Sequence, residues 1–198
     1  MYGVILVSNQ FQHLCKALFL SLSAVLTEKV YKNREVGGGK MLDVYTVSFF
    51  GHRYIDNFRL AEEKVEKLIY KLFQEHSYIE FLVGRDGDFD QIATSAVLKA
   101  KHSYAENRCD ITWVMPYEKA EYIKNAEDFE KYYDYVEVCR ESEKVHYKQA
   151  IQVRNRCMVD RSDLTVFWVE REKGGAYLTM KYAEDKQANM VNLAANIF

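Results

Sequence analysis

Residues 44–53 read VYTVSFFGHR, a near-continuous run of apolar and β-branched residues that ends in Gly51-His52-Arg53. A strand with so few polar positions is typical of a parallel sheet that is covered on both faces. From about Asn57 to Gln74, apolar residues recur every three or four positions, which predicts an amphipathic helix. The stretch therefore predicts a strand, a tight turn and a helix, the repeating unit of an α/β fold.

The same alternation continues along the chain. A second helix is predicted to begin after Asp88, which is expected to be its N-cap. Further strands are predicted at 78–84, 111–115, 164–169 and 190–193, further helices at 144–160 and 179–186, and a short helix with irregular structure at 117–140. Alternating strands and helices imply parallel pairing through right-handed crossovers. The predicted fold is a three-layer α/β/α Rossmann-like sandwich with a mainly parallel sheet.

Composition predicts one domain, assigned to residues 41–198, because 48% hydrophobic residues can form a sizeable core and no Pro/Ser-rich linker divides the chain. This part holds 22 Lys and Arg against 27 Asp and Glu, a formal net charge of −5. Nucleic acid is therefore not expected as a partner, since binding to its phosphates requires a basic surface. A phosphate site would have to be locally positive within an acidic domain.

Residues 1–40 differ in character from the rest. The apolar run ALFLSLSAVL at 17–26 is shorter than the roughly 20 residues that a membrane helix needs, and it lacks the flanks of a signal peptide. No membrane association is expected, and the predicted location is the cytoplasm. The segment REVGGGKM at 34–41 resembles a translated ribosome-binding site before a start codon. Either Met41 is the natural start and residues 1–40 are a mis-called or loosely attached extension, or the segment contains a genuine helix.

The sequence predicts no metal and no cofactor. The four cysteines lie far apart, with no Cys-x-x-Cys pair and no histidine at ligand spacing, so reduced, mostly buried thiols are expected. The run Asp86-x-Asp88-x-Asp90 has the alternate carboxylates of a calcium loop, but its glycine is at the second loop position and Val97 is at the twelfth. A turn that leads into a helix, with Asp90 available for a ribose hydroxyl, explains this run better.

Four short polar segments follow predicted strands or precede predicted helices. In an open α/β sheet, ligands bind in the crevice beyond the carboxyl ends of the strands, and helix N-termini there favour anions. The segments are Gly51-His52-Arg53, GRDGDFD at 84–90, RNRCMVDRSD at 154–163, and Gly174-Gly175 with Thr179. Together they predict a site for an anionic, nucleotide-like molecule. Neither a Walker motif nor a GxGxxG fingerprint is present in the sequence, so a P-loop ATPase is excluded.

Each segment also has a purely structural interpretation, as a turn glycine, a solvated helix cap or a surface ion pair. Within the third segment, Arg154 shares a helix face with Met158 and is predicted to reach the crevice. Arg156 is expected to pair with Asp160, one turn later, and only to brace the end of the helix.

The motifs FFGHR at 49–53, FLVGRDGDFDQIA at 81–93, RNRCMVDRSD at 154–163 and GGAYLTMKYA at 174–183 resemble those of the SLOG superfamily. This Rossmann-like group includes the DNA-processing protein DprA and the Lonely Guy phosphoribohydrolases. Within it, the chain is most similar to the YpsA-like branch of uncharacterised bacterial proteins. The resemblance covers nearly all of residues 44–193.

The resemblance implies a nucleotide or nucleotide-derived ligand above the glycine turns. The residues expected to bind it are Gly51, His52, Arg53, Gly84, Arg85, Gly87, Asp90, Arg154, Asn155, Gly174, Gly175 and Thr179. Lonely Guy enzymes carry an R-x3-M-x4-D pattern, which is matched here by Arg154, Met158 and Asp163. Their PGGxGT loop and the glutamate after it are not matched, because Ala176-Tyr177-Leu178 precedes Thr179.

Three hypotheses follow. The first is a cytosolic protein that binds a nucleotide or a nucleotide derivative as a sensor or signalling component. The second is a nucleoside 5′-monophosphate phosphoribohydrolase, whose catalytic candidates are Arg154, Asp90, Asp163 and Glu184. The third is a protein-interaction module without a small ligand, with an interface in the tyrosine-rich segment 117–147. A homo-oligomer is compatible with all three by analogy of fold.

Overall fold

The computed structural model describes residues 35–36, 40–41 and 43–195. It divides into two compact units, residues 1–43 and 44–198. In the first unit, β1 (Glu35–Val36) and β2 (Lys40–Met41) form an antiparallel pair. The expectations for residues 1–34 lie outside the described residues, and the hypothesis of a natural start at Met41 stays a prediction.

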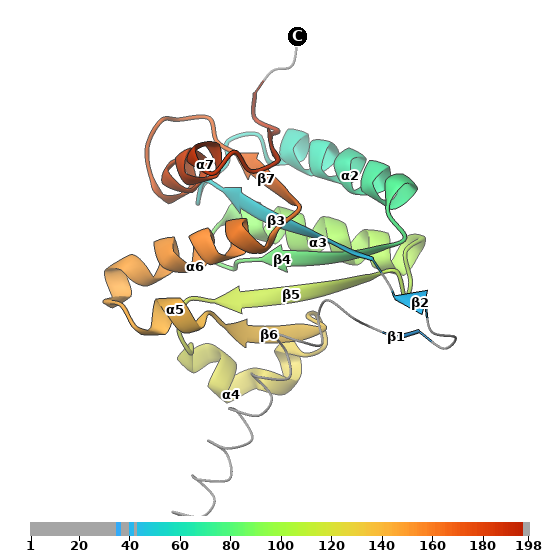
Figure 1. Ribbon diagram of the computed structural model, residues 1–198, viewed down its shortest axis with the longest axis horizontal. Helices are drawn as coiled ribbons and strands as arrows, with labels where there is room; N and C mark the ends of the chain where they lie inside the picture. The colour runs from blue at the N-terminus through green and yellow to red at the C-terminus, as the bar shows by residue number, and fades with distance from the viewer. Residues whose placement is uncertain (1–34, 37–39, 42, 196–198) are drawn as a thin grey trace, which may run out of the picture. The chain divides into compact units, whose positions relative to one another are not determined.

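The second unit contains a six-stranded, all-parallel sheet (Figure 1). In sequence order its strands are β3 (Val44–Gly51), β4 (Tyr78–Val83), β5 (Cys109–Met115), β6 (Tyr135–Val138), β7 (Leu164–Trp168) and β8 (Met190–Asn192). In space their order is β6-β5-β4-β3-β7-β8. The chain thus proceeds outward from β3 to β6 and then returns to the other side of β3. The order reverses between β3 and β7, and ligands of open α/β sheets bind at such a switch point.

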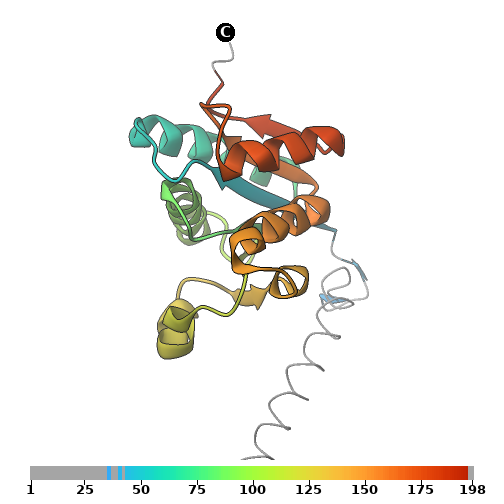
Figure 2. The same cartoon turned by 90° about the vertical axis from the view of Figure 1, so that its left-hand side faces the viewer.

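Helices cover both faces of this sheet. On one side lie α2 (Phe58–Glu75) and α3 (Asp88–Ser103), and on the other lie α6 (Tyr147–Arg161) and α7 (Gly175–Asp185), as Figure 2 shows. The shorter α4 (Ala120–Phe129) and α5 (Arg140–Glu143) flank β6. The predicted three-layer sandwich is confirmed. No helix within the described part of the chain is long and apolar enough to cross a membrane.

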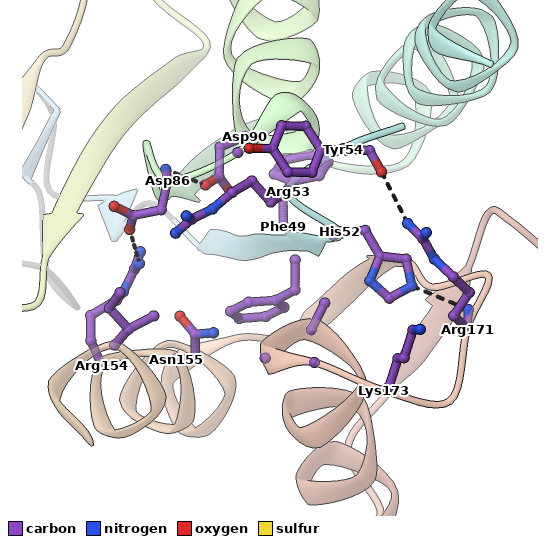
Figure 3. A pocket seen from close by; sticks show the side chains of 17 residues that line it. Phe49, His52, Arg53, Tyr54, Asp86, Asp90, Arg154, Asn155, Arg171 and Lys173 are labelled. Carbon is purple, nitrogen blue, oxygen red and sulfur yellow. Dashed lines mark hydrogen bonds and ion pairs between the residues drawn. The ribbon is translucent and has the colours of Figure 1, made fainter. Parts of the chain in front are cut away.

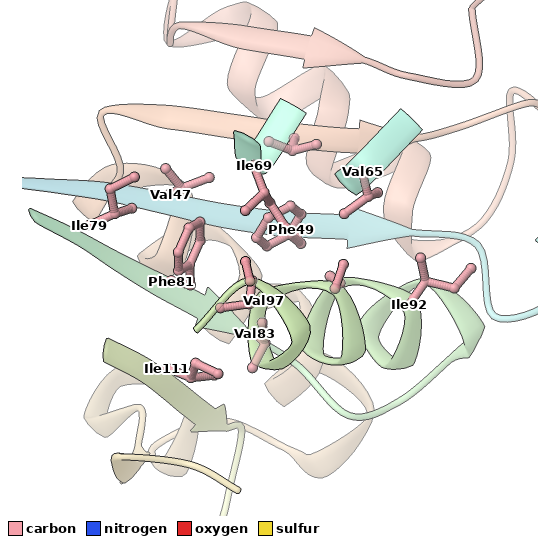
Figure 4. Close-up of a cluster of buried hydrophobic side chains, with 14 of the residues drawn as sticks. Val47, Phe49, Val65, Ile69, Ile79, Phe81, Val83, Ile92, Val97 and Ile111 are labelled. Atoms are coloured by element: carbon pink, nitrogen blue, oxygen red, sulfur yellow. The ribbon is translucent and has the colours of Figure 1, made fainter. Parts of the chain in front are cut away.

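The core explains why the strands read as continuous apolar runs. Successive side chains of a strand point to opposite faces of the sheet. Accordingly, Val47 and Phe49 pack in the cluster beneath α2 and α3 (Figure 4), whereas Phe50 packs in the cluster with α6 and α7. Helices cover both faces, so most strand positions on either face are apolar.

Several boundaries differ from the sequence-based expectations. The strand β6 was not predicted, because YVEV lies at the sheet edge and all four of its residues are only half-buried. The helix expected at 144–160 is α6 and begins at Tyr147, the short α5 before it lies just outside the expected range, and the last helix begins at Gly175 rather than at Thr179. Asp88 is the first residue of α3 and Gly87 is its N-cap. The carboxylate of Asp88 instead accepts a hydrogen bond from Ile55 N at 3.1 Å, which fixes the turn after β3.

Candidate functional site

A cavity of about 450 Å³ opens where β3 and β7 end, at the switch point of the sheet. Four segments that are far apart in sequence line it, as Figure 3 shows. Two of them are the end of β3 with the turn after it (Phe49, Phe50, Gly51, His52, Arg53, Tyr54), and the start of α3 with the turn before it (Asp86, Gly87, Asp90). The other two are one side of α6 (Ile151, Arg154, Asn155) and the loop into α7 with its first residues (Arg171, Lys173, Gly174, Gly175, Ala176). The volume is in the range of small-molecule sites.

Arg154 is the buried charge of this site. Its Nη2 donates to Asp86 Oδ2 at 2.7 Å and its Nη1 donates to the carbonyl of Val114 at 3.2 Å. Lys119 Nζ contacts the other oxygen of Asp86 at 2.7 Å. Burial alone would raise the pKa of Asp86, but Arg154 and Lys119 outweigh it and lower that pKa below its ordinary value. Arg154 reaches the crevice as predicted, but both of its terminal nitrogens already have protein acceptors.

Asp90 lies beside this pair and closes the start of α3. Its Oδ2 accepts a hydrogen bond from Asp86 N at 2.7 Å, so the carboxylate satisfies a backbone donor at the helix N-terminus. Burial raises the pKa of Asp90, against the opposing effect of Arg154. A Cβ on Gly84 would come within 2.7 Å of Arg154 Nη1 and 2.9 Å of Asp90 Oδ2. Gly84 is thus needed for close packing beneath the site.

His52 connects the turn after β3 to the loop after β7. Its Nε2 accepts a hydrogen bond from Arg171 N at 3.1 Å, which requires the neutral ring to carry its proton on Nδ1. Burial lowers the pKa of His52, and the positive charge of Arg171 lowers it further. Arg171 in turn donates from Nη2 to Tyr54 O at 3.3 Å. The imidazole therefore acts at neutral pH as an uncharged brace between two pocket loops.

The first turn of α7 forms another wall of the cavity. Gly174 is its N-cap, with φ 88° and ψ −179°, and no side chain caps the helix. The amide groups that begin a helix have no partner within it and carry partial positive charge. Lys173 precedes them directly, and Arg171 lies on the same side in Figure 3. This end of the cavity is thus suited to an anion.

Asn155 and Thr179 form the joint between α6 and α7. Asn155 Nδ2 donates to Thr179 Oγ1 at 3.0 Å, and the Thr179 hydroxyl donates to Gly175 O at 2.9 Å. Thr179 is fully buried and does not line the cavity. Its hydroxyl was expected to contact the ligand, but it holds the first turn of α7 in place.

Other expected site residues lie elsewhere. Arg85 points away from the cavity, pairing with Glu121 at 3.3 Å and lying over the Phe129 ring at 4.8 Å. Asp163 lies at the opposite end of the strands from the cavity, because it directly precedes β7, and its Oδ2 accepts a hydrogen bond from Thr46 N at 2.8 Å. Glu184 pairs with Lys181 on the exposed side of α7. Neither acid reaches the cavity, so Asp90 and Arg154 are the catalytic candidates that line it.

The expected pairing of Arg156 with Asp160 is also replaced. Arg156 lies over the ring of Tyr182 at 5.2 Å, and Asp160 accepts a hydrogen bond from the Tyr182 hydroxyl at 2.9 Å. Both residues thus brace α6 against α7. The structural role expected for Arg156 is correct, but its contact is a different one.

Sequence reasoning missed four polar or charged residues of the cavity. Asp86 was weighed only as a calcium ligand or a solvated cap, and Tyr54, Arg171 and Lys173 were not singled out. The last two lie in an irregular loop, where no periodicity indicates which side chains turn inward. Their one signal is proximity to Gly174-Gly175, since cations beside an uncapped helix start favour an anion.

The acidic run at the start of α3 forms no calcium cage. Its three carboxylates bind different partners: Asp86 binds Arg154, Asp88 binds Ile55 N, and Asp90 binds Asp86 N. Each already has a protein partner of its own, so the three do not converge on one point, and an arginine at this position repels a cation.

Comparisons with known proteins give a structural match only. No protein-family model matches the chain, and no curated protein matches it in sequence. Among solved structures, DNA processing protein A (DprA) from Streptococcus pneumoniae aligns over 74% of this chain and 49% of its own, with a TM-score of 0.52 and 16% identity. DprA from Helicobacter pylori aligns over 74% and 63%, with a TM-score of 0.51 and 14% identity.

The fold is shared with DprA. At these identities the likeness shows a shared Rossmann-like fold and nothing finer. The chain spans about half to two thirds of the DprA chains that it matches. One expectation is corrected: nucleic acid was not expected as a partner, yet H. pylori DprA, which shares this fold, binds single-stranded DNA. The negative charge of residues 41–198 was the wrong criterion, because a fold can bind phosphates through a local patch on an acidic molecule.

Proposed function

We propose that this chain binds a nucleotide in the cavity at the switch point, with the phosphate at the start of α7. The charge of the cavity supports this proposal most directly. Four cationic side chains and two carboxylates line it, although residues 41–198 carry a formal net charge of −5. The cavity is thus locally positive within an acidic domain, the condition that a phosphate site must meet here.

The two ends of the cavity differ in chemistry, which suggests an orientation for the ligand. Lys173, Arg171 and the uncapped first turn of α7 offer donors and positive charge for a phosphate. Across the cavity, Asp86, Asp90 and Asn155 offer acceptors that suit ribose hydroxyl groups. Tyr54 lies at the mouth with 71% of its surface exposed, so its ring is free to stack on a base. A nucleoside monophosphate satisfies both ends at once.

Calorimetric titration of the full chain with nucleoside monophosphates tests the proposal. Lys173→Ala should weaken binding about 10- to 100-fold, the effect of losing one charge-assisted hydrogen bond. Lys67→Ala, on the exposed side of α2, is the matched control and should bind as the wild type does. Equal affinity for the Lys173→Ala variant would refute the assigned phosphate position.

The sugar end is tested with a second ligand pair. If Asp90 and Asn155 accept from the ribose, a 2′-deoxynucleotide should bind less tightly than its ribonucleotide counterpart under the same conditions. Equal affinities would place the sugar elsewhere in the cavity.

Single-stranded DNA is the second candidate ligand. The likeness to H. pylori DprA favours it, and an arginine- and lysine-lined mouth with an exposed tyrosine suits a base and its phosphate. A deoxyoligonucleotide that binds much more tightly than any mononucleotide, with an affinity that falls as salt rises, would favour this candidate.

Nucleotide N-glycoside hydrolysis rests on Asp90, a buried carboxyl group in the cavity whose raised pKa suits proton transfer. Release of free base from a nucleoside monophosphate, lost in Asp90→Asn, would support it.

The interaction-module hypothesis would gain support if no nucleotide or oligonucleotide bound to the chain. Tyr132 and Tyr147, in the segment proposed as its interface, are exposed. Membership of the YpsA-like bacterial branch, a cytoplasmic location and a homo-oligomeric state remain parts of the proposal.

A further inference from the structure

Three side chains with metal-binding chemistry meet at the edge of the sheet, outside the cavity described above. Cys139 follows β6 directly, Glu141 lies in α5 and Cys157 lies in α6. The two thiols converge on one carboxylate oxygen: Cys139 Sγ lies 3.4 Å and Cys157 Sγ 3.6 Å from Glu141 Oε2. The three donor atoms all lie within 4.8 Å of one another.

We propose that Cys139, Glu141 and Cys157 form a binding site for a thiophilic divalent cation, with Zn²⁺ the best fit. In a tetrahedral zinc centre, a sulfur at about 2.3 Å and a carboxylate oxygen at about 2.0–2.2 Å lie about 3.5 Å apart. The two sulfur–oxygen distances here, 3.4 and 3.6 Å, already match that edge. The ion would enter between the three atoms and replace the two thiol protons, which leave to solvent.

The donor set decides which metal is favoured. Thiolates select soft or borderline cations such as Zn²⁺, whereas Mg²⁺ and Ca²⁺ require oxygen ligands throughout. Among the described residues this group supplies three donors, the usual number for a zinc site that keeps one position open to water. Glu141 is exposed and Cys157 is half-buried, so solvent ions have a route to the site.

A bound ion would fasten α6 to the edge of the sheet. Its ligands come from the end of β6, from α5 and from α6, so a bound ion would join all three elements. The same helix α6 carries Arg154 and Asn155 into the cavity. Metal binding here would depend only on the three ligands and not on nucleotide binding. It departs from the sequence-based expectation of no zinc, since the spacing of 139, 141 and 157 matches no common motif.

Cobalt titration of the full chain under a non-thiol reductant tests the site, because Co²⁺ reports tetrahedral thiolate ligation by its absorption. One equivalent of Co²⁺ should give ligand-field and thiolate charge-transfer bands, and Zn²⁺ should remove them. Zn²⁺ should also raise the thermal midpoint of unfolding, because it binds the folded state preferentially. Absence of thiolate bands with excess Co²⁺ on the folded, reduced chain would overturn the proposal.

Variants locate the ligands. In a Cys15→Ser background, Cys157→Ser and Cys139→Ser should each weaken Co²⁺ binding more than about 100-fold, beyond the 10- to 100-fold effect of outer partners. Glu141→Gln, which keeps the size of the side chain, should weaken it at least tenfold. Cys109→Ser is the control, because Cys109 is a buried thiol outside the cluster. Circular dichroism checks that each variant folds. Unchanged bands in folded Cys157→Ser would overturn the assignment.

Discussion

Arg154 is a guanidinium held almost entirely out of water, with 3% of its surface exposed. Such a charge is tolerated because Asp86 pairs with it at 2.7 Å and Asp90 lies beside it. The pair orients the carboxylates of the cavity. Arg154 thus shapes the site while its terminal nitrogens remain bound to the protein.

Removing the negative partner should therefore cost more than a surface ion pair does. Asp86→Asn leaves the buried Arg154 with only uncharged hydrogen-bond acceptors, and we expect a loss of about 2–4 kcal/mol in the free energy of unfolding. The expected loss is moderated because Asp90 still faces the guanidinium. Urea denaturation of both chains measures it.

The matched control is a double variant. Combining Asp86→Asn with Arg154→Met removes the buried charge itself, so the double variant should be more stable than Asp86→Asn alone. If the loss in free energy of unfolding of the double variant equals the sum of the losses of the two single variants, the pairing is contradicted.

His52 gives a prediction for pH dependence. Its folded-state pKa is lowered by burial and by Arg171, so below its ordinary value of about 6.5 the unfolded chain binds a proton more readily. Its contribution to stability is fully present above pH 6.5 and is lost as pH falls toward the folded-state pKa. His52→Gln keeps an acceptor for Arg171 N and should lose less stability between pH 7 and pH 5. Denaturation at both pH values compares the two chains, and identical pH dependence would refute this role.

At the scale of elements, the loop into α7 depends on Gly174. Its φ of 88° and ψ of −179° lie in a region that essentially only glycine adopts, and nothing lies within 4 Å of a Cβ placed there. Gly174→Ala should therefore cost about 1–3 kcal/mol through backbone strain alone, and it should weaken nucleotide binding by moving the helix start. Urea denaturation and calorimetry measure the two effects.

Gly175→Ala is the control for that loop. A Cβ at Gly175 meets only Gln152 Nε2 at 2.9 Å, the end of a flexible side chain, and Gly175 lacks the unusual backbone angles. Its stability should change by no more than a few tenths of a kcal/mol. If both variants lose stability equally, crowding rather than strain governs the loop.

The elements differ in how well the sequence predicts them, and the reason is burial. The strand at 44–50 is recognisable because both of its faces are covered, so its apolar run matches β3 closely. The edge strand β6 is half-buried throughout and reads YVEV, which matches neither a buried nor an alternating pattern. Helix periodicity identified α2 and α6, but their exact ends depend on contacts with other segments.

The candidate site follows a similar rule. Arg154 was predictable because helical spacing gives it the same face as buried Met158. Thr179 was not, since its hydroxyl faces Asn155 across a helix–helix contact that no local pattern encodes. Lys173 lies in a loop whose course depends on Gly174, so only the structure brings it to the cavity.

At the scale of the whole molecule, the second unit contains the complete sheet, both buried clusters and the cavity. We therefore expect a fragment of residues 44–198 to fold alone. Circular dichroism should show it folded, and its thermal unfolding midpoint should equal that of the full chain. A fragment that unfolds at a much lower temperature would show that residues 1–43 stabilise it.

The central claim is that a locally positive cavity in this acidic domain holds a nucleotide. A proton NMR time course of the full chain with a mixture of nucleoside mono-, di- and triphosphates, cyclic nucleotides and nicotinamide dinucleotides tests it most directly. The account predicts line broadening of one class of component, with no new signals over time, and loss of that broadening in Lys173→Ala. Sharp lines for every component in the presence of the folded chain would contradict it.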